Sequence, residues 1–308
     1  MKIVLAGGTG FVGKAVIQNF LTQGHEIILL SRNKSVTKQV LGSGSLETVQ
    51  WDAKNQGAWS VYVNGADAIV NLAGESIASK RWSDLQKVRI VKSRLNSTRA
   101  LVDAIAKASQ KPSVLINASA VGYYGDVPEE EVVESRHKGH GFLADTCERW
   151  EKEAIRANDF KVRVVLLRLG VVLGKEGGAL TKLLPPFRFF VGGPIGSGRQ
   201  WFPWVHLDDV VGAINFAIQE TSLRGPINVT APEIVRMREF CSVLGKAMKR
   251  PSWAPVPAFA LRSLLGEMAE MLLTGQRAVP QVLQNFKYPF IYPSLEKSIS
   301  SLLHSQTN

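Results

Sequence analysis

The sequence predicts an α/β protein in which a doubly wound parallel sheet is followed by a smaller C-terminal lobe. Short apolar runs alternate with stretches of helical periodicity through most of the chain, and this alternation builds parallel sheets. A glycine-rich turn directly follows the first apolar run. The length of 308 residues accommodates one large core and a smaller lobe, because single cores usually stop growing at roughly 250 to 300 residues.

The N-terminal unit is a strand, a tight turn and a helix. Residues 2–6 form the apolar run, and apolar side chains then recur at helical spacing from Phe11 up to Gly24. Residues 26–30 read Glu-Ile-Ile-Leu-Leu, which is typical of a buried strand. Because such a crossover unit joins neighbouring parallel strands, these residues begin a parallel sheet.

The later elements continue the alternation. Further strands are predicted at 47–51, 67–72, 113–118, 162–167 and 227–229. Helices are predicted at 84–109, 142–158, 208–219, 237–248 and 258–273. We place the large domain at residues 1–230, with 171–204 contributing to a substrate cleft, and the smaller lobe at 231–308.

Composition excludes several classes of protein. Hydrophobic residues make up 45% of the chain and charged residues 20%, as in ordinary globular proteins. No apolar run approaches the roughly 20 residues of a membrane-spanning helix, so we expect no membrane insertion. The only cysteines are Cys147 and Cys241, which are too few for a disulfide framework or a multi-cysteine metal site. We expect no metal.

Charge and the N-terminal segment bear on partners and location. The formal net charge is +11, but Lys and Arg are scattered and are not interleaved with aromatic residues, so nucleic-acid binding is not expected. Residues 1–6 reach the glycine-rich turn too soon for a signal peptide. The expected location is the cytoplasm, or an organelle stroma if a transit peptide has been removed.

The glycine-rich turn has the pattern of a dinucleotide-binding site. Its residues are Gly7, Gly8, Thr9, Gly10, Phe11, Val12 and Gly13, which fit both GxGxxG and GxxGxxG. The pattern alone is weak, but here it follows a strand and opens a helix, whose free N–H groups can bind a pyrophosphate. The context favours a Rossmann-type fold with a bound dinucleotide; a purely structural turn is the alternative.

The end of the second strand indicates which dinucleotide binds. An acidic residue usually stands there when the adenosine ribose has a free 2′-hydroxyl. This chain has Ser31-Arg32 instead. Because an arginine can pair bidentately with a 2′-phosphate, the cofactor is predicted to be NADP(H). The alternative is that Arg32 is a solvated surface residue.

Six motifs in order give the chain a family resemblance. They are Gly7–Gly13, Asn71–Glu75, Ser119–Gly125, Gly192–Trp201, Trp204–Asp209 and Leu272–Arg277. In these motifs the chain resembles the atypical extended short-chain dehydrogenase/reductase proteins related to nucleoside-diphosphate-sugar epimerases, some of which carry a cell-division-inhibitor (SulA-like) label. The resemblance spans nearly the whole chain. It implies a small-molecule or nucleotide-linked substrate and, as among many relatives, a homodimer.

The resemblance also implies cofactor contacts beyond the turn. Asp52 is expected near the adenine. Leu72, Ala73 and Gly74 are expected to pack along the cofactor, with Glu75 close to it. Two local alternatives remain: Asp52 caps a turn, and Gly74 simply ends a strand.

The usual proton relay of such enzymes is missing. Typical members have a Ser or Thr after the fifth strand and a Tyr-x-x-x-Lys on the next helix, in which the Lys lowers the pKa of the phenol. Ser119 matches the first element. Aligning Glu151 with the family's usual glutamate puts Leu143 at the Tyr position and Cys147 at the Lys position, and neither can act in the usual way.

Three side chains are candidates to replace the relay. Tyr123 and Tyr124 lie just beyond Ser119, where the substrate is expected, although packing or substrate contact is the alternative for both. Cys147 faces the site if its helix keeps the family geometry, and a structural thiol is the alternative. His206 directly precedes an acidic helix start, so we expect it to pair with Asp208 or a backbone carbonyl rather than to act as an acid or base.

Substrate contacts are predicted at two places. Arg94 stands where relatives commonly have Asn, and it either orients a carboxylate or phosphate or pairs with Glu75. Arg199, Gln200 and Trp201 follow a glycine-rich loop at the place where epimerase relatives hold nucleotide-sugars. Two functions stay open: an oxidoreductase or epimerase-like enzyme, and a non-catalytic NADP(H)-binding sensor or partner protein in a process such as division.

Overall fold

The computed structural model describes residues 1–33 and 45–304. Its centre is a seven-stranded sheet in the order β12-β7-β5-β4-β1-β2-β3, with every neighbouring pair parallel. The strands are β1 (Lys2–Ala6), β2 (Glu26–Ser31), β3 (Leu46–Gln50), β4 (Ala68–Asn71), β5 (Val114–Ala120), β7 (Arg163–Leu169) and β12 (Gly225–Val229). The strand order reverses between β1 and β4, which is where open α/β sheets bind ligands.

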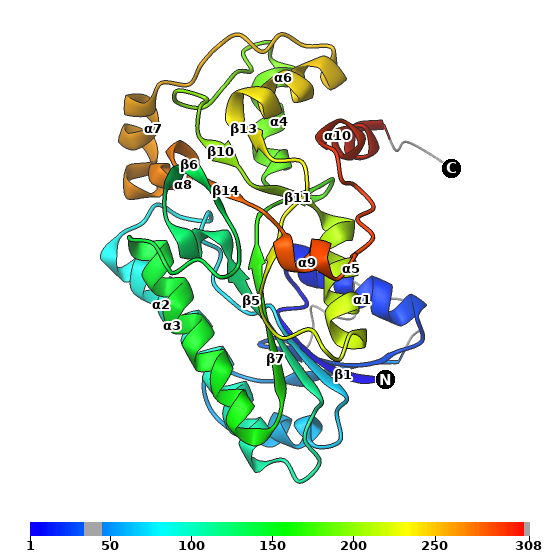
Figure 1. Cartoon of the computed structure of the whole chain (residues 1–308). Helices are drawn as coiled ribbons and strands as arrows, with labels where there is room; N and C mark the ends of the chain where they lie inside the picture. The colour runs from blue at the N-terminus through cyan, green and yellow to red at the C-terminus, as the bar shows by residue number, and fades with distance from the viewer. Residues whose placement is uncertain (34–44, 305–308) are drawn as a thin grey trace.

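Helices cover both faces of this sheet, so the predicted doubly wound, Rossmann-type fold is confirmed. Figure 1 shows α1 (Phe11–Thr22) and α5 (Leu207–Gln219) on one side, with α2 (Asp84–Lys107) and α3 (Phe142–Ile155) on the other. Successive side chains of a strand point to opposite faces. Ile3 and Leu5 therefore join the core under α1 and α5, while Val4 joins the core on the opposite face.

A third core holds the C-terminal lobe together. Its buried side chains come from two parts of the chain, Leu173 to Trp204 and Ala231 to Leu302. The first part contains β8 (Val171–Gly174), β9 (Gly177–Gly178), α4 (Leu180–Arg188), β10 (Trp201–Phe202) and β11 (Trp204–His206). The second contains β13 (Val235–Arg236), α6 (Met237–Met248), α7 (Ala258–Leu265), α8 (Glu270–Leu273) and α10 (Leu295–His304).

Smaller elements join the lobe to the large domain. β6 (Val127–Val132) follows β5 and pairs with β14 (Gln276–Ala278), and α9 (Gln281–Asn285) packs on β12. Single 3₁₀ turns occur at Ala58–Val63, Val121–Tyr124, Arg156–Phe160 and Gly266–Ala269. No helix in the described residues is long and apolar enough to cross a membrane, and these residues contain no group of three or more His, Cys, Asp or Glu side chains suited to a metal ion.

The predicted elements agree with the structure except near some helix ends. The predicted helix at 142–158 ends at Ile155 and continues as a 3₁₀ turn. The single helix predicted at 258–273 is wrong: α7 and α8 are separate, because the chain turns at Gly266, whose φ of +62° does not continue an α-helix.

Candidate functional site

The turn between β1 and α1 requires its glycines. Gly7 has a φ of +83°, and a Cβ on it would lie 2.5 Å from the carbonyl carbon of Leu72. A Cβ on Gly13 would lie 2.3 Å from the Gly7 oxygen, and one on Gly8 would lie 2.5 Å from Leu29. The turn is therefore packed against the residue that follows β4, and it has no room for a Cβ at Gly7, Gly8 or Gly13.

The start of α1 leaves backbone N–H groups for a ligand. Gly10 is the N-cap and supplies no side-chain acceptor. The Lys14 N–H donates to the Gly10 oxygen at 3.0 Å, whereas those of Phe11, Val12 and Gly13 have no protein acceptor within the described residues. Unpaired N–H groups at a helix N-terminus bind phosphate groups, so this turn fits a dinucleotide's pyrophosphate.

A hollow of about 500 Å³ lies at the ends of β2 and β3. Exposed Arg32 lines it together with Trp51, Asp52, Asn55 and Trp59. The Asp52 carboxylate accepts hydrogen bonds from the backbone N–H groups of Asn55 (2.9 Å) and Lys54 (2.8 Å). These bonds lower the pKa of Asp52 below its ordinary value. Asp52 therefore both caps a turn and borders the hollow.

Ser31 has a different environment from Arg32. Its side chain is buried, and its hydroxyl donates to the Asn33 oxygen at 2.9 Å. Ser31 therefore shapes the chain leaving β2, while the exposed Arg32 has no hydrogen-bond partner within the described residues. These two neighbours stand at the carboxyl edge of the sheet, two strands away from β4.

The segment after β4 lies beside the glycine-rich turn. Leu72 donates its N–H to the Ala6 oxygen at 2.9 Å, and the Ala73 N–H donates to the Asn71 side chain at 3.2 Å. Gly74 faces the guanidinium of Arg94, since a Cβ there would lie 3.2 Å from its central carbon. The structure thus brings the predicted residues 72–75 together with the turn at 7–13.

Arg94 contacts Glu75 through the backbone. Its guanidinium donates to the carbonyl oxygens of Glu75 (2.9 Å) and Ile90 (3.1 Å) and lies 5.1 Å from the Trp150 ring centroid. Burial lowers the pKa of Arg94. Its cation therefore fixes the position of the chain at Gly74 and Glu75, next to the predicted cofactor path.

A buried polar network continues from Ser119. The Ser119 hydroxyl donates to Glu151 at 2.6 Å, and both oxygens of Glu151 accept from Arg168, at 2.9 and 2.8 Å. Arg168 also donates to the phenol oxygen of Tyr124 at 2.8 Å. Sequence reasoning missed Arg168; its only signal is a cationic residue that directly follows the apolar run Val164–Leu167 of β7.

The two candidate tyrosines are in different states. Tyr124 is buried, and its hydroxyl donates to Asn228 at 2.7 Å while it accepts from Arg168. Burial raises the pKa of Tyr124 to about 12. Tyr123 is half-buried, with its ring centroid 3.6 Å from the guanidinium carbon of Arg168. Its hydroxyl has no hydrogen-bond partner within the described residues and is available to a ligand.

The Cys147 thiol is buried on α3. Burial raises its pKa to about 11, and the positive charge of Arg94 opposes this only in part. This environment therefore disfavours the Cys147 thiolate. Leu143, one turn earlier, lies against Gly122, because a Cβ on Gly122 would be 3.3 Å from the Leu143 Cβ.

The predicted substrate residues 199–201 take separate roles. The Gln200 amide donates to the Ile195 and Leu272 oxygens at 2.9 and 2.7 Å, which joins three segments of the lobe. The Trp201 ring lies 4.1 Å from the guanidinium of Arg236 and 5.2 Å from that of Arg277. The carbonyl oxygen of Arg199 accepts from Arg236. Sequence reasoning missed both cations: Arg236 reaches Trp201 through the pairing of β10 with β13, and Arg277 lies on β14, which pairs with β6.

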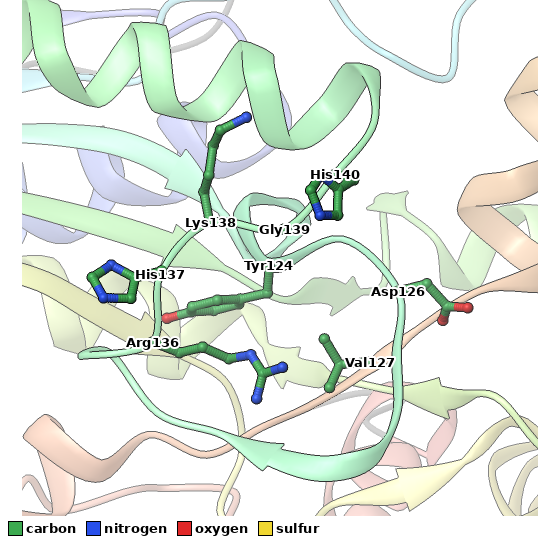
Figure 2. Close-up of a pocket in the computed structure, with 8 residues that line it drawn as sticks. All are labelled: Tyr124, Asp126, Val127, Arg136, His137, Lys138, Gly139 and His140. Carbon is green, nitrogen blue, oxygen red and sulfur yellow. The ribbon is translucent and has the colours of Figure 1, made fainter.

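A second hollow, of about 540 Å³, lies beside Tyr124 (Figure 2). Its lining residues are Tyr124, Asp126, Val127, Arg136, His137, Lys138, Gly139 and His140. Arg136 pairs with Glu130, and Lys138 pairs with Asp145. Neither Ser119 nor Cys147 lines this hollow, which meets the buried network of Ser119 only at Tyr124.

Together these features define a Rossmann-type protein with a dinucleotide-binding turn. The chain belongs to the NAD dependent epimerase/dehydratase family, whose model matches residues 3–230. Residues 256–302 match a domain of unknown function, DUF1731.

Named relatives match over almost the whole chain. The chloroplastic epimerase family protein SDR39U1 homolog of Arabidopsis thaliana is 41% identical over 305 residues, 98% of this chain and 87% of that protein. Epimerase family protein YfhF of Bacillus subtilis is 39% identical, with 98% of each chain covered. The crystal structure of human SDR39U1 (isoform 2) with NADPH aligns with a TM-score of 0.88 at 33% identity, covering 99% of this chain and 100% of that one.

Proposed function

We propose that this protein binds NADP(H) with its pyrophosphate on the turn at Gly7–Gly13 and its adenosine phosphate beside Arg32. The observation that carries the proposal is the set of unpaired N–H groups at the start of α1. A hollow lined by Arg32 at the ends of the neighbouring strands β2 and β3 supports it. The human relative was solved with NADPH, which supports the same choice. Leu72 to Glu75 form the wall along which the cofactor extends.

The cofactor assignment is tested by titrating the protein with NADPH and with NADH. Arg32→Ala should weaken NADPH binding about ten- to a hundredfold, because a charge-assisted hydrogen bond is lost, and should leave NADH binding nearly unchanged. Arg89→Ala, an exposed arginine on α2, is the matched control. Equal affinity of the wild type for both nucleotides would remove the role of Arg32, and no binding of either at submillimolar concentration would make the turn purely structural.

We further propose an oxidoreductase or epimerase-like activity on a small or nucleotide-linked substrate. The bound nicotinamide would supply the hydride chemistry. Since the Ser119 hydrogen is committed to Glu151, Ser119 accepts a hydrogen bond from a substrate hydroxyl. Tyr123 exchanges the proton, because its half-buried hydroxyl has no hydrogen-bond partner within the described residues and its ring is held against Arg168.

The role of Tyr123 is tested by screening hydroxyl and carbonyl substrates for NADP(H) turnover. Tyr123→Phe should abolish turnover of any substrate found and leave NADPH affinity unchanged. Retention of turnover in this variant would exclude Tyr123 as the proton-exchanging group.

A second function, an NADP(H)-responsive sensor or partner protein without catalysis, is favoured by one observation. Leu143 and buried Cys147 occupy the positions of the missing Tyr and Lys, so the standard relay is replaced by apolar packing. A sensor needs different contacts in its bound and free states. It would therefore show nucleotide-dependent protection in hydrogen exchange without turnover of any screened compound.

A further inference from the structure

The apex of the C-terminal lobe exposes aromatic side chains. Phe189 is 76% exposed and Trp253 is 67% exposed, and the neighbouring Phe190 and Val191 are 54% and 51% exposed. Figure 1 shows the chain after α6 as an arch at the end of the molecule farthest from the N-terminus. Phe259, on α7, is another 76% exposed ring. Soluble proteins rarely leave several large rings in water without a use for them.

Specific contacts hold these rings outward. The Trp253 indole donates to the Phe190 oxygen at 3.1 Å, and the Arg250 guanidinium lies 4.3 Å from the Phe190 ring. Phe190 has a φ of +63°, which is unusual for a bulky residue. The Ala254 N–H donates to the Gly192 oxygen at 3.1 Å. The apex is therefore a built surface in which segments 189–192 and 250–254 are joined.

The two sequence segments that contain the apex have only basic charged residues, of which Arg262 is paired with Glu270 outside them. Segments 180–200 and 240–266 contain seven basic residues and no Asp or Glu: Lys182, Arg188, Arg199, Lys246, Lys249, Arg250 and Arg262. These segments therefore carry +7 of the chain's formal +11. Arg188 and Lys249 are exposed beside the rings. Such a surface repels a second copy of itself and attracts an anionic partner.

We propose that this apex, defined by residues 188–191 and 249–253, adsorbs to anionic lipid surfaces. Indole and phenyl rings partition into the headgroup region of a bilayer, and flanking Lys and Arg add attraction to anionic headgroups. Neither of the two hollows described above is lined by apex residues, and the apex presents protruding rings. The adsorption is peripheral, in keeping with the absence of a spanning helix in the described residues.

Vesicle flotation of the full chain tests this proposal. The wild type should float with vesicles that contain about a third phosphatidylglycerol and should stay behind with pure phosphatidylcholine. Both Phe189→Ser/Trp253→Ser and Arg188→Glu/Lys249→Glu should reduce partitioning at least about tenfold. The matched controls are Leu85→Ser, an apolar residue that is 61% exposed on α2, and exposed Lys92→Glu on the same helix.

Brominated lipids supply a second readout. They should quench tryptophan fluorescence of the wild type, and Trp253→Phe should remove that quenching. Thermal unfolding checks that each variant is folded. Failure of the wild type to float, flotation of the ring variant at the wild-type level, or quenching that persists in Trp253→Phe would each overturn the proposal. An acidic protein partner would then be the class to test. NADPH affinity should be unchanged throughout, so this result is separate from the cofactor assignment.

Discussion

Arg168 and Glu151 are the residues on which the candidate site most depends. Both are buried, and their side chains bond through two hydrogen bonds. Removing one member of such a pair leaves an uncompensated charge away from water. The pair holds Ser119 from one side and Tyr124 from the other, and the Tyr123 ring lies on the Arg168 guanidinium, so its integrity decides the positions of Ser119 and Tyr123.

Glu151→Gln should lower the free energy of unfolding by about 3 kcal/mol, because the Arg168 charge loses its counterion. Denaturant unfolding measures this. Glu131→Gln breaks the exposed ion pair with Arg277 and should cost under about 1 kcal/mol. Equal effects of the two substitutions would mean that the buried pair contributes no more than a surface one.

His206 gives the stability a predictable pH dependence. It is the N-cap of α5, where its Nδ1 accepts from the Asp208 N–H at 3.0 Å, and its ring stacks on Tyr292 with the centroids 3.8 Å apart. Burial lowers its pKa from 6.5, although the Asp208 carboxylate acts in the opposite direction. Below pH 6.5 the unfolded chain therefore binds more protons than the folded one. The stabilisation from neutral His206 is complete above that pH and is lost as pH falls toward the folded pKa.

His206→Asn isolates this contribution, since Asn also accepts a hydrogen bond at an N-cap but does not titrate. As pH rises toward about 6.5, the free energy of unfolding should rise more steeply with pH in the wild type than in the variant, by at most one proton in slope. His25, whose pKa burial also lowers, is present in both proteins and cancels. Parallel curves would show that His206 does not titrate differently in the folded state.

The site residues differ in whether a contiguous sequence motif reveals them. The glycine-rich turn and Arg32 could be predicted because the motif and the strand before it are contiguous in sequence. Arg168, Asn228 and the pairing of Trp201 with Arg236 depend on which strands become neighbours. Tyr124 donates a hydrogen bond to Asn228, which lies 104 positions away in the sequence. No periodic pattern in the sequence reveals such a pair.

At the scale of elements, the strands of the central sheet and the helices that cover it were predictable, whereas β6, the small strands of the lobe, α4 and α10 were not predicted. The apolar runs that became β1, β2, β5 and β7 are buried on both faces, and their composition shows it. By contrast, β8 and β9 form a hairpin rich in glycine. Glycine there has a packing reason: a Cβ on Gly174, Gly177 or Gly178 would lie 2.5 to 2.9 Å from the Phe11 ring.

This contact couples the β8–β9 hairpin to the glycine-rich turn, because Phe11 is the first residue of α1. Gly177→Ala should lower the free energy of unfolding by about 1 to 3 kcal/mol through overpacking, and it should weaken NADPH binding by displacing Phe11. Thermal unfolding and NADPH titration measure the two effects. Gly57→Ala, where the nearest contact would be 3.4 Å away, is the control for stability. An unaltered affinity in Gly177→Ala would show that the hairpin yields instead of Phe11.

At the scale of the whole molecule, the lobe and the large domain are not separated at a single position in the sequence. We place a domain limit at residue 230, yet the third core packs 171–204 against 231–302. The C-terminal segment also binds the large domain directly, since both oxygens of Asp209 on α5 accept from the backbone N–H groups of Ile291 and Tyr292. The two parts should therefore unfold together.

A chain that ends at Thr230 should not form a stable monomer. It would expose Leu173, Leu180, Phe187, Phe202 and Trp204, which are buried in the third core, at a cost on the order of 10 kcal/mol, comparable with the whole stability of a domain, about 5 to 15 kcal/mol. Circular dichroism melting should show one cooperative transition for the full chain and for a control ending at His304, and none for the shortened chain. A cooperative transition of the 1–230 chain within a few degrees of the full-length midpoint would instead establish that the large domain folds alone and that the lobe docks on a finished core.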